Sequence, residues 1–257
     1  MTIWVDGQLL GGSDVPRSQA IAPFETMGAR SGLLPLWSQH LARLTSTARL
    51  LGLAFEPTPE LAAASNEVLR ANGHTEDVLR LSLVPEVAGG ERPKVVLVSR
   101  QRSPIKTVRL LPTVVERSID CPPGDIKAEP RRFYDAVRQQ AQDGNADDGI
   151  VVGSDGQLLE TALGNLWLHV GGKWVTPPLD GRVLPGIARA LLLEHAAASG
   201  LVVDERPCTF ADLHEAAAIA HTNAVYGPRP ACLVGASAAR EIVDSELGAL
   251  WRAATSA

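Results

Sequence analysis

The sequence predicts an α+β protein built from two domains. Helix-like and strand-like hydrophobic patterns both occur along the chain. A segment at 119–125, which reads Ile-Asp-Cys-Pro-Pro-Gly-Asp, breaks both patterns and is the best linker candidate. The 257 residues suffice for one large domain or for two of roughly 120 residues, each able to bury a core. We therefore expect a smaller sheet-and-helix domain over residues 1–118 and a larger, β-rich domain over residues 119–257.

The expected N-terminal domain combines two helices with antiparallel strands. A short strand begins at Ile3 and enters an Asp-Gly turn. Apolar residues at three- and four-residue steps predict a helix over 38–53, and a second helix is expected over 59–71. Strand-like runs follow at 78–84, 95–99 and 108–111. The turns at 88–91 and 102–104 favour antiparallel pairing of these strands.

The expected C-terminal domain contains more strands and three helices. The first helix covers 130–143, with Pro130 in its first turn. A strong helix over 187–199 follows a Leu-Pro-Gly turn and stops at Gly200. Thr209 caps a short helix that runs to residue 217, with Asp212 three residues further on. Strands are expected at 149–152, 166–170, 173–176, 201–203 and 218–220.

Composition and charge exclude several classes of protein. The net charge of −5 is not that of a typical nucleic-acid-binding surface. No apolar run is long enough for a membrane span, and the first residues lack the pattern of a secretory signal. Three distant cysteines suit a reducing cytoplasm rather than a disulfide framework. The six histidines lack metal-ligand spacing, so no metal site is expected, and the common hydrolase and P-loop motifs are missing.

Two charged residues are candidates for chemistry on an amine. The chain has four lysines against twenty arginines, so a reaction that needs a lysine amine has four candidates. Lys127 lies between the linker candidate and a helix, where it is either a solvated charge or a Schiff-base lysine that attacks a carbonyl. Glu160 ends a strand-like run, where it is either exposed at a turn or the anion that faces a pyridinium nitrogen.

Three further features are candidates for binding a phosphate group. The turn at 184–186 leads into a helix, whose free N–H groups and dipole favour an anion, although it also reads as an ordinary helix start. Arg43 lies on the first predicted helix and is either a surface arginine or a phosphate-binding cation. Thr222, at the end of a buried-looking strand, either caps that strand or offers a hydroxyl and an N–H group to the same phosphate.

The order of these motifs is more specific than any one of them. The series runs Phe24–Met27, His40–Leu44, Lys127, Glu160–Leu166, Thr176–Leu179, Leu184–Arg189 and His221–Asn223. It resembles the fold-type IV pyridoxal-phosphate enzymes, the class IV aminotransferases, over nearly the whole chain. That family includes branched-chain and D-amino-acid aminotransferases and aminodeoxychorismate lyase. The resemblance implies a small N-terminal α/β sandwich, a larger C-terminal β-barrel-like domain with helices, and a homodimer.

The resemblance also implies a cofactor, pyridoxal 5'-phosphate, and a role for each candidate residue. Lys127 would carry the cofactor as a Schiff base and move the proton at the α-carbon of an amino-acid-like substrate. Glu160 would face the pyridine nitrogen. The remaining cofactor-binding residues would be Arg43, Asn165, Ile187, Ala188 and Thr222, with Arg43, Thr222 and the amides of Ile187 and Ala188 on the phosphate.

The chain departs from the family pattern at several places. The segment at 16–23 is shorter than the stretch that usually precedes the Phe-Glu-Thr motif and walls the substrate side. The tyrosine often found five residues after the lysine is replaced by Arg132, and Tyr134 is the candidate to stand in for it. Small apolar residues replace frequent hydroxyl residues at Ala162, Gly164 and Ala188.

Three functions follow from this pattern. The segments 160–166 and 172–179 look most like aminodeoxychorismate lyases, which release pyruvate and leave 4-aminobenzoate. The alternative is a class IV aminotransferase that moves an amino group between a D- or branched-chain amino acid and a 2-oxo acid. A third hypothesis is a cofactor-binding protein without turnover, or a dimeric interaction protein.

Overall fold

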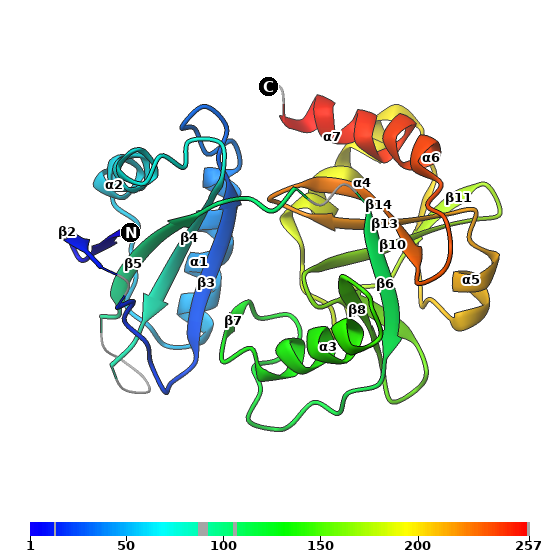
Figure 1. The fold of residues 1–257 in the computed structure, drawn as a ribbon, viewed down its shortest axis with the longest axis horizontal. Coiled ribbons are helices and arrows are strands. Elements are labelled where there is room, and N and C mark those ends of the chain that lie inside the picture. Colours follow the sequence, from blue (N-terminus) through cyan, green and yellow to red (C-terminus); the bar gives the residue numbers. More distant parts are fainter. Residues whose placement is uncertain (13, 87–91, 105–106, 256–257) are drawn as a thin grey trace. The chain divides into compact units, whose positions relative to one another are not determined.

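The structure, a computed structural model, describes residues 1–12, 14–86, 92–104 and 107–255. The chain forms two compact units (Figure 1). The N-terminal unit comprises Met1–Ser103 and Ile126–Pro130, and the C-terminal unit comprises Pro104–Asp125 and Arg131–Ala257. This division differs from the expected one at residue 118, and it places Lys127 with the N-terminal unit.

Strand pairing explains the difference. β6 (Val108–Thr113) pairs in parallel with β14 (Gly227–Leu233) and with β8 (Asp148–Val152), so it belongs to the C-terminal sheet. The expected antiparallel pairing of 95–99 with 108–111 is therefore wrong. β7 (Ala128–Glu129) instead pairs with β3 (Ala22–Gly28) of the N-terminal sheet. The expected turn at 88–91 lies outside the described residues.

The N-terminal unit is a two-layer α/β sandwich, as expected. Its sheet has the order β2-β1-β5-β4-β3-β7. The strands not yet introduced are β1 (Thr2–Val5), β2 (Gln8–Gly11), β4 (Val78–Val84) and β5 (Lys94–Arg100). Helices α1 (Trp37–Leu50) and α2 (Pro59–Ala71) pack on this sheet.

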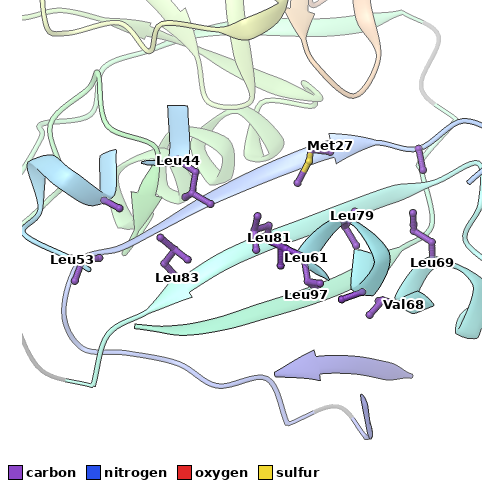
Figure 2. Packing of buried hydrophobic residues seen from close by; sticks show 13 residues of the cluster. Met27, Leu44, Leu53, Leu61, Val68, Leu69, Leu79, Leu81, Leu83 and Leu97 are labelled. Carbon is purple, nitrogen blue, oxygen red and sulfur yellow. The ribbon is translucent and has the colours of Figure 1, made fainter. Parts of the chain in front are cut away.

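The core of the N-terminal unit lies between the two helices and the sheet (Figure 2). Alternate residues of a strand point to one face, and β4 contributes Leu79, Leu81 and Leu83 to this core. Leu44 of α1 and Val68 of α2 meet them from the helical layer. Complete burial of such side chains supplies roughly 1.5–3 kcal/mol each, which holds the helices to the sheet.

The C-terminal unit contains a closed β-barrel, which agrees with the expected barrel-like domain. Its sheet has the order β12-β11-β10-β13-β14-β6-β8-β9, and β9 also pairs with β10, which closes the ring. The remaining strands are β9 (Leu158–Thr161), β10 (Gly164–Val170), β11 (Lys173–Thr176), β12 (Val203–Glu205) and β13 (Ala218–Asn223). The barrel core is apolar and includes Leu110, Ile150, Leu158, Leu166 and Leu168.

The helices of the C-terminal unit are α3 (Arg132–Asp143), α4 (Ile187–Ser199), α5 (Phe210–Glu215), α6 (Arg240–Ser245) and α7 (Leu247–Thr255). Two of them, α4 and α5, follow the capping signals in the sequence, whereas α3 begins at Arg132, so Pro130 lies before its first turn and not in it. α4 ends at Gly200, whose φ of 77° is the left-handed conformation that glycine adopts readily. The predicted capping box is also present, because Thr209 and Asp212 bond each other's main-chain N–H groups. Within the described ranges, no helix is both long and apolar enough to span a membrane.

Candidate functional site

Lys127 is held at the edge of the N-terminal sheet by main-chain bonds. Its carbonyl oxygen accepts a hydrogen bond from the Phe24 N–H group at 3.0 Å, and the next residues form β7 against β3. Its side chain is half-buried, and the Nζ atom lies 4.7 Å from the centre of the Phe24 ring. The same ring carries the Arg80 guanidinium at 3.6 Å, and Arg80 is paired with Glu129 at 2.8 Å. An amine and a paired guanidinium therefore share one aromatic ring.

Arg43 is bonded to a buried carboxylate rather than lying free on the surface. Its Nε atom donates to Glu25 Oε1 at 2.7 Å, and its Nη2 atom donates to Glu25 Oε2 at 2.6 Å. Glu25 is 1% exposed and also accepts a bond from His40 Nδ1 at 2.7 Å. Burial opposes ionisation of Glu25, but the charges and hydrogen bonds of Arg43 and His40 together outweigh it and lower the pKa of Glu25 to about 2.

His40 completes this cluster in a neutral state. Burial lowers the pKa of His40 below its usual value, although Glu25 acts in the opposite direction. The neutral ring keeps its proton on Nδ1, which donates to Glu25. Nε2 is then an acceptor, and it has no hydrogen-bond partner among the described residues. The candidate residues did not include Glu25 or His40. The signal that could have found the histidine is its spacing of three residues from Arg43, which places both on one helix face.

Glu160 lies in β9 of the C-terminal unit and is 3% exposed. This burial disagrees with its interpretation as an exposed turn residue. The Tyr134 hydroxyl donates to Glu160 Oε1 at 2.6 Å, and the Leu184 N–H group donates to Glu160 Oε2 at 3.1 Å. Both donors stabilise the charged carboxylate. Glu160 is thus a buried anion held by two different elements.

Tyr134, the candidate to stand in for the family's tyrosine, lies in α3. Burial and, next, the charge of Glu160 raise its pKa well above the usual value, so its hydroxyl stays protonated and acts as a donor. Arg117 Nη2 donates to the Tyr134 oxygen at 3.2 Å, and its guanidinium lies 4.0 Å from the centre of the Phe133 ring. Arg117, Tyr134 and Glu160 therefore form one hydrogen-bonded chain.

The turn before α4 is fixed by Asn165. The Asn165 Nδ2 atom donates to the Leu184 carbonyl at 2.9 Å. Gly186 packs so closely on Asn165 that an added Cβ atom would overlap the amide oxygen. The turn therefore requires a glycine, although the φ of Gly186, −69°, is ordinary for any residue. It presents the first amides of α4, those of Ile187 and Ala188, which have no acceptor within the helix.

Thr222 lies in β13 opposite Asn165 of β10 and is fully buried. Its hydroxyl oxygen accepts a bond from the Trp167 indole N–H at 3.0 Å. A hydroxyl that accepts one bond still has its own hydrogen to donate. The Trp167 contact thus fixes the Thr222 side chain without using its hydrogen.

The seven predicted residues fall into two groups. In the N-terminal unit, Lys127 and Arg43 contact consecutive residues of β3, namely Phe24 and Glu25. In the C-terminal unit, the turn at Leu184 bonds both Glu160 and Asn165. The other members of that group are Ile187, Ala188 and Thr222. Within the described residues, no group of three or more His, Cys, Asp or Glu side chains is arranged to hold a metal ion.

Comparison with known protein families identifies the family of this chain. The model of the family described as "Amino-transferase class IV" matches residues 22–234. The chain belongs to this family. The predicted family and the predicted fold-type IV architecture are therefore confirmed.

Individual class IV aminotransferases show how far the similarity extends. The bifunctional aminodeoxychorismate lyase / D-amino acid transaminase of Mycobacterium tuberculosis is 27% identical over 248 residues, which cover 85% of this chain and 86% of that protein. The mitochondrial branched-chain-amino-acid aminotransferase of Rattus norvegicus is 37% identical over 106 residues, or 38% of this chain. The chain spans 27% of the length of that rat enzyme and of its mouse counterpart.

The fold agrees with solved structures of this family. A branched-chain amino acid aminotransferase from T.th., solved with pyridoxamine 5'-phosphate, superposes with a TM-score of 0.84. It is 18% identical, and the match covers 99% of this chain and 94% of that one. At this identity the likeness concerns the fold.

Proposed function

We propose that this class IV aminotransferase is a pyridoxal 5'-phosphate enzyme that acts on an amino-acid-like substrate. The observation that carries the proposal is the buried Glu160 carboxylate, which accepts two hydrogen bonds beside the turn that opens α4. A cofactor with a basic ring nitrogen and an anionic phosphate needs an anion and a set of N–H donors, and the C-terminal unit places both around the Leu184 turn. The T.th. aminotransferase of the same fold was solved with pyridoxamine 5'-phosphate, a form of this cofactor.

The donor set fits each part of this cofactor. Lys127 offers a primary amine for the aldehyde. Glu160 offers a carboxylate for the ring nitrogen, since a carboxylate has about four lone-pair sites and can accept more bonds than those from Tyr134 and Leu184. The groups proposed for the phosphate are Arg43, the amides of Ile187 and Ala188, and Thr222, with Asn165 holding the turn that presents the two amides.

The bound cofactor would supply an electron sink for the bond that breaks at the substrate's α-carbon. The protein residues do the rest. Lys127 would hold the aldehyde of the cofactor, and its amine, when free, would accept the α-proton of the substrate. Glu160 would keep a proton on the ring nitrogen, because a nearby negative charge favours the protonated ring. The α4 amides and dipole would hold the phosphate, and Arg43 is the further cation proposed for it.

We propose aminodeoxychorismate lyase activity, which forms 4-aminobenzoate and pyruvate, as the first reaction to test. The lyase-like segments 160–166 and 172–179 and the Mycobacterium tuberculosis relative support it. The second candidate is transfer of an amino group from a D- or branched-chain amino acid to a 2-oxo acid. The same bifunctional relative and the rat branched-chain aminotransferase support that reaction. We also propose that the protein is a cytoplasmic homodimer. Light scattering on the purified protein would test the dimer.

The first experiment follows the cofactor. We expect the purified protein to bind pyridoxal 5'-phosphate with a visible absorption band that Lys127→Ala abolishes. The matched control is Lys173→Ala, because Lys173 is exposed on β11 and paired with Asp204. If the band persists in Lys127→Ala, or is lost in the control, Lys127 is not the residue whose amine binds the cofactor.

The second experiment separates the reactions. Pyruvate release from aminodeoxychorismate without an added 2-oxo acid supports the lyase. Transfer from D- or branched-chain amino acids to 2-oxoglutarate supports the aminotransferase. Cofactor binding without either activity would indicate the third hypothesis, a cofactor-binding protein without turnover.

A further inference from the structure

We propose that Tyr134 is a positioning residue that holds Glu160 as a carboxylate facing the cofactor's ring nitrogen. This inference rests on the function proposed above. It concerns a residue outside the seven predicted ones.

The contacts of Glu160 carry the first step. A donor reaches each carboxylate oxygen: the Tyr134 hydroxyl at 2.6 Å on Oε1 and the Leu184 N–H group at 3.1 Å on Oε2. The donors come from α3 and from the turn before α4, so the carboxylate plane is fixed from two directions. The bond from Tyr134 is the shorter of the two and the only one of them that a side-chain substitution can remove.

The state of Tyr134 carries the second step. Its hydroxyl is the donor in this pair, because an ionised Glu160 offers no hydrogen. Its raised pKa keeps it protonated, so it cannot act as a base near neutral pH. Arg117 donates to the same hydroxyl oxygen at 3.2 Å, which strengthens the bond that Tyr134 gives to Glu160.

The chemical consequence concerns one proton. When a pyridine nitrogen meets a carboxylate, the proton between them sits either on the nitrogen, as an ion pair, or on the oxygen, as a neutral pair. The Tyr134 hydrogen bond stabilises the carboxylate more than the neutral acid, so it favours the proton on the ring nitrogen. The protonated ring is the better electron sink, which links Tyr134 to the reaction through Glu160.

The chain offers a matched control for this proposal. It contains two tyrosines, Tyr134 and Tyr226. Tyr226 lies in the C-terminal unit as well, where the Arg229 guanidinium stacks on its ring at 4.2 Å. Tyr134→Phe and Tyr226→Phe each remove one phenol oxygen and keep the ring.

The first test reads the ring nitrogen directly. The enzyme is loaded with pyridoxal 5'-phosphate labelled with ¹⁵N in the ring, and the nitrogen chemical shift reports its protonation. We expect a protonated nitrogen in the wild type and in Tyr226→Phe. In Tyr134→Phe we expect a shift toward the unprotonated value, with the proton equilibrium changed about tenfold, equivalent to about 1.4 kcal/mol.

The second test uses the protein without cofactor and covers the case in which Tyr134→Phe fails to fold. In Tyr226→Phe, Tyr134 is the remaining tyrosine, and ultraviolet absorbance follows its ionisation. We expect this ionisation well above the pH at which free tyrosine ionises, and at a lower pH when Glu160→Gln is added. Ordinary titration of Tyr134, or no response to Glu160→Gln, would overturn the proposal.

The outcomes separate this inference from the proposed function. A wild-type protein that binds no pyridoxal 5'-phosphate overturns both. Binding with the same ¹⁵N shift in wild type and Tyr134→Phe overturns the role of Tyr134 alone. Equal shifts in the two phenylalanine variants would mean that loss of any phenol oxygen perturbs the site, and this too overturns the specific role.

Discussion

Substitution of Gly186 by alanine tests how the turn before α4 is built. Gly186 has a φ of −69°, so alanine fits the backbone, and loss of chain entropy in the unfolded state alone would stabilise the protein by roughly 0.4–1 kcal/mol. The new Cβ atom, however, would overlap the Asn165 amide oxygen and lie 3.1 Å from its Cγ atom. Asn165 is buried and bonded to the Leu184 carbonyl, so it cannot move without losing that bond.

The expected magnitude follows from these opposing terms. Overpacking of a filled site costs about 1–3 kcal/mol, and the lost hydrogen bond costs about 1 kcal/mol. After the entropic gain is subtracted, we expect Gly186→Ala to destabilise the C-terminal unit by about 2 kcal/mol. For a protein of this size that corresponds to a melting temperature lower by roughly 4–8 °C.

Scanning calorimetry of four proteins tests the reasoning: wild type, Gly186→Ala, Asn165→Ala and the double variant. Because Asn165→Ala removes the overlapping oxygen, we expect Gly186→Ala to be neutral or slightly stabilising in that background, a non-additivity of about 2 kcal/mol. Gly11→Ala is the control, because Gly11 lies in open space without positive φ. Additive effects, or a Gly186→Ala variant as stable as the wild type, would refute the contact as the reason for the glycine.

Three further predictions concern other buried or capping contacts. Ionisation of Glu25 adds stability that is fully present above its ordinary pKa of 4.5 and is lost as the pH falls toward about 2, because Arg43 and His40 together outweigh the effect of burial. Urea unfolding of Glu25→Gln across that range should therefore show a weaker acid dependence than the wild type, by up to about 3 kcal/mol. Thr209→Ala removes the side-chain acceptor of the Asp212 N–H group and should cost about 1 kcal/mol in urea unfolding, whereas Thr209→Ser should cost little. Trp167→Phe removes the donor to Thr222 and should weaken phosphate and pyridoxal 5'-phosphate binding in titration calorimetry, and unchanged affinities would contradict the role given to this hydroxyl.

The sequence predicted the elements whose pattern is local. α2 begins at a proline and β4 has a run of apolar residues, and both were found at the expected residues, Pro59–Ala71 and Val78–Val84. The capping box of α5 and the glycine that ends α4 were also correct. These features depend on a few neighbouring residues, which a sequence displays directly.

Partnerships between distant segments were harder to predict. The strand at 108–111 was expected beside the strand before it, but it pairs with β8 and β14, which come later in the chain. The pattern of a short strand such as β6 indicates which face is buried, but it does not specify which strand lies beside it. The β14, α6 and α7 segments carried no motif and were not predicted.

The same limit applies to the candidate site. Motif order led to Lys127, Glu160 and Arg43, but their partners could not be read from spacing. Glu25 lies 18 residues from Arg43, and Tyr134 lies 26 residues from Glu160. Each pair joins a strand residue to a helix residue, and such contacts depend on how the helix packs on the sheet.

The placement of Lys127 shows that the break at 119–125 ends where the chain passes from the C-terminal unit into the N-terminal unit, between Asp125 and Ile126, and not at the single boundary that was expected. After this break the chain joins the N-terminal sheet for the two residues of β7, which pair with β3. Two residues are too few to show any periodicity, so only the structure reveals the strand. Main-chain bonds to β3 set the position of this segment, as the bond from the Phe24 N–H group to the Lys127 carbonyl shows. Since these bonds do not involve the lysine side chain, Lys127→Ala should keep the local backbone and remove only the amine, which makes it a clean test of the proposed chemistry.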